Sequence, residues 1–250
     1  MSNKSISTVG FYLRPLKAIC NLAKNDNVIS ELSYPFGKGK YQIPASRNIK
    51  KALTKDELKR LYQYPTLEGT PEDRAKDYWF FSYLCNGINM NDMFKLKYKN
   101  IDFQNETITF IRTKTKKTNR QNLKPILAII TPQIKTIIKK WGNPHVNPNV
   151  YVFPILSDGL SPNDELKRIN QGIKTTNKYM KRIGKELDFP LILTSYVARH
   201  TYSTILKNSG YAVSFISESL GHSSLKTTQN YLDSFDTESK KEAANKLLDF

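Results

Sequence analysis

The stretch that decides the fold is the C-terminal segment 194–231, TSYVARHTYSTILKNSGYAVSFISESLGHSSLKTTQNY. It places Arg199, His222 and Tyr231 in this order along what the pattern predicts to be consecutive short helices. Phosphoryl transfer without a metal needs such a set: a nucleophile attacks phosphorus, cations hold the non-bridging oxygens, and an acid protonates the leaving oxygen. The planar fork of an arginine binds two of those oxygens at once. A tyrosine suits reversible attack, because a phosphotyrosine ester keeps the energy of the phosphodiester for rejoining.

The composition of the whole chain favours a polyanionic partner. Its 250 residues include 39 Lys and Arg against 22 Asp and Glu, a net charge of +17. Aromatic residues make up 11%, which is too many for a chain that is disordered throughout. The longest apolar run, around 126–130, is far shorter than the ~20 residues that a membrane-spanning helix needs. Because a large positive excess neutralises phosphates well, nucleic acid is the leading expectation, and a merely basic protein is the alternative.

The cysteines indicate a reducing compartment. Cys20 and Cys85 are too few and too far apart for a disulfide framework, and neither belongs to a set spaced as zinc ligands. The first residues are polar, and no apolar segment of a secretory signal follows them. Together these features predict a cytoplasmic protein.

Helix-start signals predict the first elements. Residues 7–24 carry apolar side chains at helical spacing, although Pro15 conflicts with an unbroken helix. A capping box over 54–57 predicts the start of a second helix. A cap followed by proline predicts a third helix over 70–86, which the next glycine should end.

The middle of the chain predicts a β-hairpin. Residues 107–111 and 123–130 are β-branched or apolar, and a basic polar turn joins them. The further predicted elements are helices over 132–141 and 162–187 and a short strand over 150–153. The predicted organisation is a small helical segment 1–33, a linker 34–52 rich in Pro, Gly and charge, and a main domain 53–250.

Residues from about 53 to the C-terminus resemble the catalytic domain of the tyrosine recombinases, the phage-integrase type. The motifs that carry the resemblance are Arg-His-Thr at 199–201, Leu-Gly-His-Ser-Ser at 220–224 and Thr-Thr-x-x-Tyr at 227–231. The resemblance implies a mainly α fold with a small antiparallel β-sheet. It also implies that Arg199 is the second phosphate-binding arginine, His222 the box III histidine and Tyr231 the nucleophile. The segment 1–33 resembles part of the family's helical core-binding domain, which clamps DNA.

The predicted hairpin resembles the family as well. Residues 111–115, IRTKT, match the family's turn between the second and third strands, where Lys114 would be the acid that protonates the leaving 5′ oxygen. A flexible basic loop that tracks the DNA backbone is the alternative. The cations expected to contact DNA are Arg112, Lys116, Lys117, Arg120 and Lys124.

The sequence departs from the family's pattern at two catalytic positions. Tyr196 stands where box II has a histidine; it can hydrogen-bond a phosphate oxygen but is a poor base at neutral pH. Asn89 stands where box I has an arginine, and a neutral amide supplies no charge. In a subgroup resembling conjugative-transposon integrases, a cation from the preceding helix is thought to stand in. The candidates are Lys76, which we prefer, and Arg74; roughly 200° of helix separates them, so both cannot face one phosphate. Asp92 stands where the family has a buried acid that orients catalytic groups.

The resemblance implies the function of a site-specific recombinase or integrase of a mobile element. Such an enzyme cleaves and rejoins DNA strands through a 3′-phosphotyrosine intermediate, with no metal and no other cofactor. The implied partner is double-stranded DNA, on which the protein would form a homotetramer that exchanges C-terminal segments. In this chain the exchanged segment would be 237–250, unless that segment is an amphipathic helix that folds back on its own domain.

Three other functions stay open. A type IB topoisomerase would use similar chemistry as a monomer. A catalytically impaired relative would act as a DNA-binding regulator, and Asn89 and Tyr196 favour it. A basic RNA-binding module is the most distant alternative, because the sequence has no RNP-type aromatic motif and no KH-type glycine loop.

Overall fold

The structure is a computed structural model that describes residues 5–44, 52–114, 124–222, 225–229, 232 and 245. The chain divides into two units, 1–49 and 50–250. Within the described residues, no helix is both long enough and apolar enough to cross a lipid bilayer.

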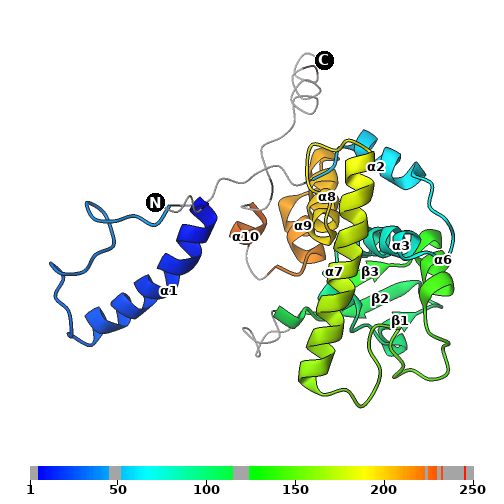
Figure 1. Ribbon diagram of the computed structural model, residues 1–250, viewed down its shortest axis with the longest axis horizontal. Helices are drawn as coiled ribbons and strands as arrows, with labels where there is room; N and C mark the ends of the chain where they lie inside the picture. Colours follow the sequence, from blue (N-terminus) through cyan, green and yellow to red (C-terminus); the bar gives the residue numbers. More distant parts are fainter. Residues whose placement is uncertain are drawn as a thin grey trace. The chain divides into compact units, whose positions relative to one another are not determined.

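The first unit contains helix α1 (Ile6–Asn25; Figure 1). Ser5 caps this helix, because its hydroxyl accepts a hydrogen bond from the Thr8 backbone N–H. The helix expected over 7–24 is confirmed, and it continues through Pro15. A proline inside a helix removes one backbone bond and crowds the preceding turn, but neither effect ends α1.

The second unit is mainly helical and holds one small sheet (Figure 1). Its α-helices are α2 (Lys55–Gln63), α3 (Pro71–Leu84), α4 (Met90–Met93), α6 (Pro132–Trp141), α7 (Pro162–Glu186), α8 (Ser195–Asn208), α9 (Val213–Ser219) and α10 (Leu225–Gln229). A 3₁₀ turn, η1 (Tyr98–Asn100), precedes the strands β1 (Ile101–Asp102), β2 (Thr107–Phe110) and β3 (Ile126–Ile129). The expected fold class is therefore confirmed.

Side-chain caps begin the helices of the second unit. The Thr54 hydroxyl accepts from the Glu57 N–H, while the Glu57 carboxylate accepts from the Thr54 N–H, as the capping box predicts. Thr70, Thr131 and Ser161 cap α3, α6 and α7 in a similar way, and each is followed by a proline. The predicted starts of these four helices are confirmed.

The strands form an antiparallel sheet in the order β1-β2-β3. Ile108 and Phe110 of β2 pair with Ala128 and Ile126 of β3, and all four side chains are buried. Alternate residues of β2 and β3 face the core, as the period of two in a strand requires. The predicted hairpin is thus confirmed in the described residues, with shorter strands than expected.

Two features of the sheet region differ from expectation. The strand predicted over 150–153 is wrong: only an isolated bridge between Tyr151 and Lys97 forms there. Pro148 and Pro154 flank the bridge, and a proline has no N–H with which to extend a ladder. The additional strand β1 has two residues, too few to show alternation in the sequence.

Helix α3 lies at the centre of the second unit. Its Tyr78, Trp79 and Phe81 are at most 2% exposed, and it packs against α6, α7 and α8. Figure 1 shows α7 running along the length of this unit. Trp79 Nε1 donates to the Thr194 carbonyl at 3.0 Å, immediately before α8. This bond links α3 to the beginning of α8 and helps to hold the residues that follow α3 near α8.

Candidate active site

Arg199 joins three parts of the second unit. It lies on α8 and is 3% exposed. Its Nη1 donates to the Gly87 carbonyl at 2.9 Å, and its Nη2 donates to the Leu220 carbonyl at 2.5 Å. Nη2 also lies 3.1 Å from Nε2 of His222. A buried charge needs hydrogen bonds to offset its desolvation, so these contacts hold the guanidinium in one place.

Gly87 allows the backbone to approach Arg199 closely. It follows α3 with a φ of +62°, a conformation that side chains rarely adopt. A Cβ at this position would lie 2.9 Å from the Arg199 Cα and 3.0 Å from its Cγ. Only a glycine fits between the end of α3 and this face of α8.

His222 lies between Arg199 and α10. Its Nε2 faces the Arg199 guanidinium, and its Nδ1 is 2.8 Å from the Thr228 hydroxyl. Because an arginine N–H only donates, Nε2 accepts and the ring proton sits on Nδ1. Burial, followed by the positive charges of Arg199, Arg112 and Lys114, lowers the pKa of His222 from 6.5 to about 3. The imidazole is therefore neutral at pH 7.

The chain after β2 brings two more cations toward His222. Arg112 Nη1 donates to the Gly221 carbonyl at 3.0 Å. The N–H of Thr113 donates to Asp92 Oδ1 at 3.0 Å, and Asp92 is 6% exposed on α4. This buried carboxylate fixes the segment that carries Arg112 and Lys114, in accord with the positioning role expected of it.

A pocket of about 280 Å³ contains three of the predicted site residues. Its walls are formed by Asn89, Lys114 and Tyr196, together with Met90, Asn91, Asp92, Ile173 and Ser195. Tyr196 precedes Arg199 by one turn of α8 and is 47% exposed. Its ring meets the His200 ring edge-on, with the centroids 4.7 Å apart. The structure therefore brings Asn89, Lys114 and Tyr196 together.

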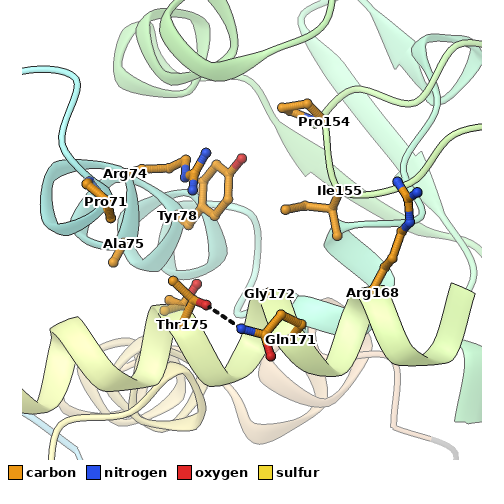
Figure 2. Close-up of a pocket in the computed structure, with 11 residues that line it drawn as sticks. Pro71, Arg74, Ala75, Tyr78, Pro154, Ile155, Arg168, Gln171, Gly172 and Thr175 are labelled. Atoms are coloured by element: carbon orange, nitrogen blue, oxygen red, sulfur yellow. Dashed lines mark hydrogen bonds between the residues drawn. The ribbon is translucent and has the colours of Figure 1, made fainter. Parts of the chain in front are cut away.

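The structure does not bring Lys76 or Arg74 to this cluster. The Lys76 ammonium donates to the Tyr64 carbonyl. Arg74 lines a different pocket of about 290 Å³ between α3 and α7, where Figure 2 shows it beside Tyr78. Both cations lie in the first half of α3, and about 12 Å of helix axis separates Lys76 from Leu84. The preference for Lys76 as the substitute cation therefore gains no support from the geometry.

Several predicted site residues lie outside the described residues. These are Tyr231, Lys116, Lys117 and Arg120. Lys124 is described, and it is exposed just before β3. In the sequence, Tyr231 follows Thr228 by three residues, and the Thr228 hydroxyl contacts His222.

From the sequence, Arg112 is expected to contact DNA and not to belong to this cluster. The sequence does carry a signal for the cluster, because Arg112 stands two residues before Lys114 and alternate residues of an extended chain share a side. Thr228 and Gly221 carry no comparable signal. A hydroxyl partner for a histidine and a carbonyl partner for an arginine depend on how three segments meet.

The family model described as the phage integrase family matches residues 51–238. The chain belongs to the phage integrase family. It is 24% identical over 231 residues to the tyrosine recombinase XerA of Pyrococcus furiosus. This alignment covers 91% of this chain and 70% of XerA. It is 27% identical over 241 residues to a tyrosine recombinase of Thermosipho africanus. That alignment covers 96% of this chain and 76% of the relative. The chain is thus a site-specific recombinase of the tyrosine type.

Solved structures support the fold. The Tn1549 transposon integrase in complex with a circular intermediate DNA matches with a TM-score of 0.63 at 17% identity, over 98% of this chain and 80% of the integrase chain. The crystal structure of XerA recombinase matches with a TM-score of 0.52 at 20% identity, over 79% of this chain and 65% of that chain. At 17% and 20% identity, both likenesses concern the fold alone.

Proposed function

We propose that this recombinase cleaves and rejoins strands of double-stranded DNA through a covalent 3′-phosphotyrosine intermediate. The Tyr231 phenol gives its proton to solvent, and its oxygen bonds to the scissile phosphorus as the bond from phosphorus to the 5′ oxygen breaks. The 5′ oxygen takes a proton from Lys114 and leaves as a hydroxyl. The 5′ hydroxyl of a partner strand then attacks the phosphotyrosine and returns its proton to Lys114. The bond from phosphorus to the Tyr231 oxygen breaks, and the phenolate regains a proton from solvent. The family match and the tyrosine recombinase relatives support this reaction.

The observation that carries the proposal is the contact between Arg199 and His222. Two motifs that stand 23 residues apart in the sequence meet at 3.1 Å in a part-buried position. The Arg199 guanidinium contacts two backbone carbonyls and the His222 imidazole, and these contacts fix its position. A guanidinium that such contacts hold in one place is preorganised for the negative charge that builds on phosphate oxygens in the transition state.

His222 and Tyr196 would contribute hydrogen bonds to the same phosphate. A bound phosphate anion opposes the positive charges that lower the pKa of His222, so that pKa rises and the ring can gain a proton to donate. The Tyr196 hydroxyl would donate to a non-bridging oxygen in place of the box II histidine. Its partial exposure beside Lys114 in the pocket supports this role.

We also propose the organisation that acts on DNA. Segment 1–33 would be part of a DNA clamp, 34–52 a linker and 53–250 the catalytic domain; the division of the chain at residue 49 falls in that linker. The protein would act in the cytoplasm as a homotetramer that exchanges the segment 237–250. That segment lies outside the described residues apart from Asn245. The net charge of +17 supports binding to DNA.

Covalent trapping tests the proposed function. A nicked suicide duplex carries one end of the DNA element that encodes the chain, and a denaturing gel detects the protein–DNA adduct. We expect Tyr231→Phe to abolish the adduct. The matched variant Tyr211→Phe changes a tyrosine that is 51% exposed before α9, and it should keep the adduct. Intact DNA binding with no adduct in the unaltered chain contradicts the proposal.

A catalytically impaired DNA-binding regulator is the second candidate function. Asn89 and Tyr196 line the pocket where the family pattern has an arginine and a histidine, and this observation favours the candidate. Gel-shift binding to the same duplex, with no covalent adduct at any pH from 6 to 9, would support it.

A further inference from the structure

We infer that Arg112 binds the scissile phosphate together with Arg199. It supplies the positive charge that Asn89, at the position of the box I arginine, does not supply. The inference rests on the proposed function. It moves the substitute cation from α3 to the end of β2, where Arg112 would contact a non-bridging oxygen of the scissile phosphate together with Arg199.

Arg112 and Arg199 are anchored on consecutive carbonyls. Arg199 Nη2 donates to the Leu220 carbonyl at 2.5 Å, and Arg112 Nη1 donates to the Gly221 carbonyl at 3.0 Å. Consecutive Cα atoms are about 3.8 Å apart, so the two guanidiniums meet the same turn, immediately before His222. A guanidinium has five N–H donors, and a bond to a carbonyl is compatible with a bond to a phosphate oxygen. Arg199 shows the same carbonyl anchoring in the position that the family motif assigns to phosphate.

The charges of this cluster converge on one imidazole. Arg112, Arg199 and Lys114 are the three cations whose charges lower the pKa of His222, after its burial. Arg199 Nη2 lies 3.1 Å from His222 Nε2, and Arg112 Nη1 donates to the carbonyl of Gly221, the residue before His222. The two guanidiniums therefore lie at the turn whose histidine the motifs place at the phosphate. A phosphate oxygen there would relieve their mutual repulsion.

Packing holds the Arg112 side chain in this position. The bond from the Thr113 N–H to the buried Asp92 fixes the backbone next to Arg112. On the other side, a Cβ at Gly221 would lie 3.1 Å from the Arg112 Cδ and 2.3 Å from Ile126 Cδ1. The glycine thus leaves the space that Arg112 occupies beside β3.

The other candidate groups do not meet these conditions. Lys76 donates to the Tyr64 carbonyl, and Arg74 lies in the pocket between α3 and α7 (Figure 2). Asn89 lines the site but is neutral. Lys114 lines the site as well, and its proposed task is to protonate the leaving oxygen.

Binding of inorganic phosphate to the full chain tests the inference without DNA. The Cε1–H signals of the three histidines are followed by NMR at constant ionic strength, and the His222 signal is assigned from His222→Asn. Phosphate should shift that signal saturably, and Arg112→Ala should weaken the apparent Kd about tenfold. Arg112→Lys keeps the positive charge but lacks the planar guanidinium that binds two oxygens. Its Kd should lie between those of the unaltered chain and Arg112→Ala. The matched variant Arg168→Ala removes an exposed arginine from α7 and should leave the Kd unchanged.

Three results of the phosphate titration would overturn the inference. The first is an unchanged Kd for phosphate in Arg112→Ala. The second is a Kd that Lys76→Ala weakens as much as Arg112→Ala does. The third is the absence of a saturable shift of the His222 signal in the unaltered chain. Thermal unfolding of each variant shows whether it folds, and the conservative Arg112→Lys carries the test if Arg112→Ala does not.

A neutral phosphate analogue separates this inference from the proposed function. The suicide duplex is made with either a phosphate or a methylphosphonate at the scissile position, so that one non-bridging oxygen and its charge are removed. Arg112→Ala should slow adduct formation about 100-fold on the phosphate duplex and should regain most of its rate on the methylphosphonate duplex. A purely structural role would give no such rescue.

If the unaltered chain forms the adduct and Arg112→Ala forms it equally fast, the inference is wrong and the proposed function stands. If the unaltered chain forms none, the proposed function fails, and the phosphate titration decides on Arg112.

Discussion

At the scale of single residues, the neutral state of His222 predicts how stability changes with pH. In the folded chain, burial and then neighbouring positive charges lower its pKa from 6.5 to about 3. Below pH 6.5 the unfolded chain therefore binds a proton that the folded chain does not. The free energy of unfolding should fall as the pH drops from 6.5 toward 4. The fall should stay below the limit of about 1.4 kcal/mol per pH unit for one proton, because His222 is only part-buried and solvent screens its shift. Urea unfolding at a series of pH values between 7 and 4.5 measures the slope.

Two histidine variants separate this effect from the titration of carboxylates. His222→Asn should remove the part of the slope that comes from this proton. His145→Asn changes an exposed histidine that stacks on Tyr98, and it should keep the full slope. Equal slopes in the unaltered chain and in His222→Asn would show that His222 is not held neutral.

Single-residue contacts are predictable where a motif carries them. The motif spacing indicates that Arg199 and His222 act together, and the structure has them in contact. The position of Arg112 against the Gly221 carbonyl is not predictable in this way, since it depends on where β2 ends relative to the turn after α9. The expectation for Lys76 illustrates the same difficulty. Its helix is predicted correctly, but the direction of the side chain is not: the Lys76 ammonium donates to the Tyr64 carbonyl.

At the scale of elements, the turn after α3 predicts a loss of activity that exceeds the loss of stability. Gly87→Ala would place a Cβ 2.9 Å from the Arg199 Cα and would also strain a backbone with φ of +62°. The clash must shift α8 or the turn, so Arg199 moves relative to the phosphate. A displacement of about 1 Å can cost roughly 100-fold in rate. The rate of adduct formation on the suicide duplex measures this loss.

A second glycine provides the control for backbone strain. Gly210 follows α8 with a φ of +84°, and a Cβ there would meet nothing within 4 Å. Gly210→Ala should lose about 1–2 kcal/mol of stability from strain alone and should keep the rate. If Gly87→Ala and Gly210→Ala form the adduct equally fast, the close approach to Arg199 does not matter for the reaction.

Elements are predictable where local chemistry determines them. Side-chain caps and a following proline determine the starts of α3, α6 and α7, and these agree with the sequence. Strands are less predictable, because a strand exists only where a partner pairs with it. The apolar segment 150–153 meets only a bridge at Lys97, while the two residues of β1 pair because β2 lies beside them.

At the scale of the whole molecule, the positive charge is a property of the sequence that needs no fold. The excess of +17 favours DNA, but it does not say which cations contact phosphates. The hairpin cations Lys116, Lys117 and Arg120 lie outside the described residues, so their contribution is a prediction from the sequence. A measurement that counts phosphate contacts can decide whether these hairpin cations contact DNA.

The salt dependence of DNA binding supplies that count. A triple variant, Lys116→Gln with Lys117→Gln and Arg120→Gln, should reduce the slope of log K against log salt by about 0.9 for each phosphate contact that it removes. The matched triple variant changes exposed lysines of α2 and α6 to glutamine, at Lys55, Lys59 and Lys139. It lowers the net charge by the same amount.

Fluorescence anisotropy of a labelled duplex from 50 to 300 mM salt measures both slopes. Because the two variants have the same net charge, a slope that falls only in the hairpin variant assigns the contacts to the hairpin. Equal slopes would mean that the excess charge acts on DNA as a diffuse field and that the hairpin makes no phosphate contacts of its own.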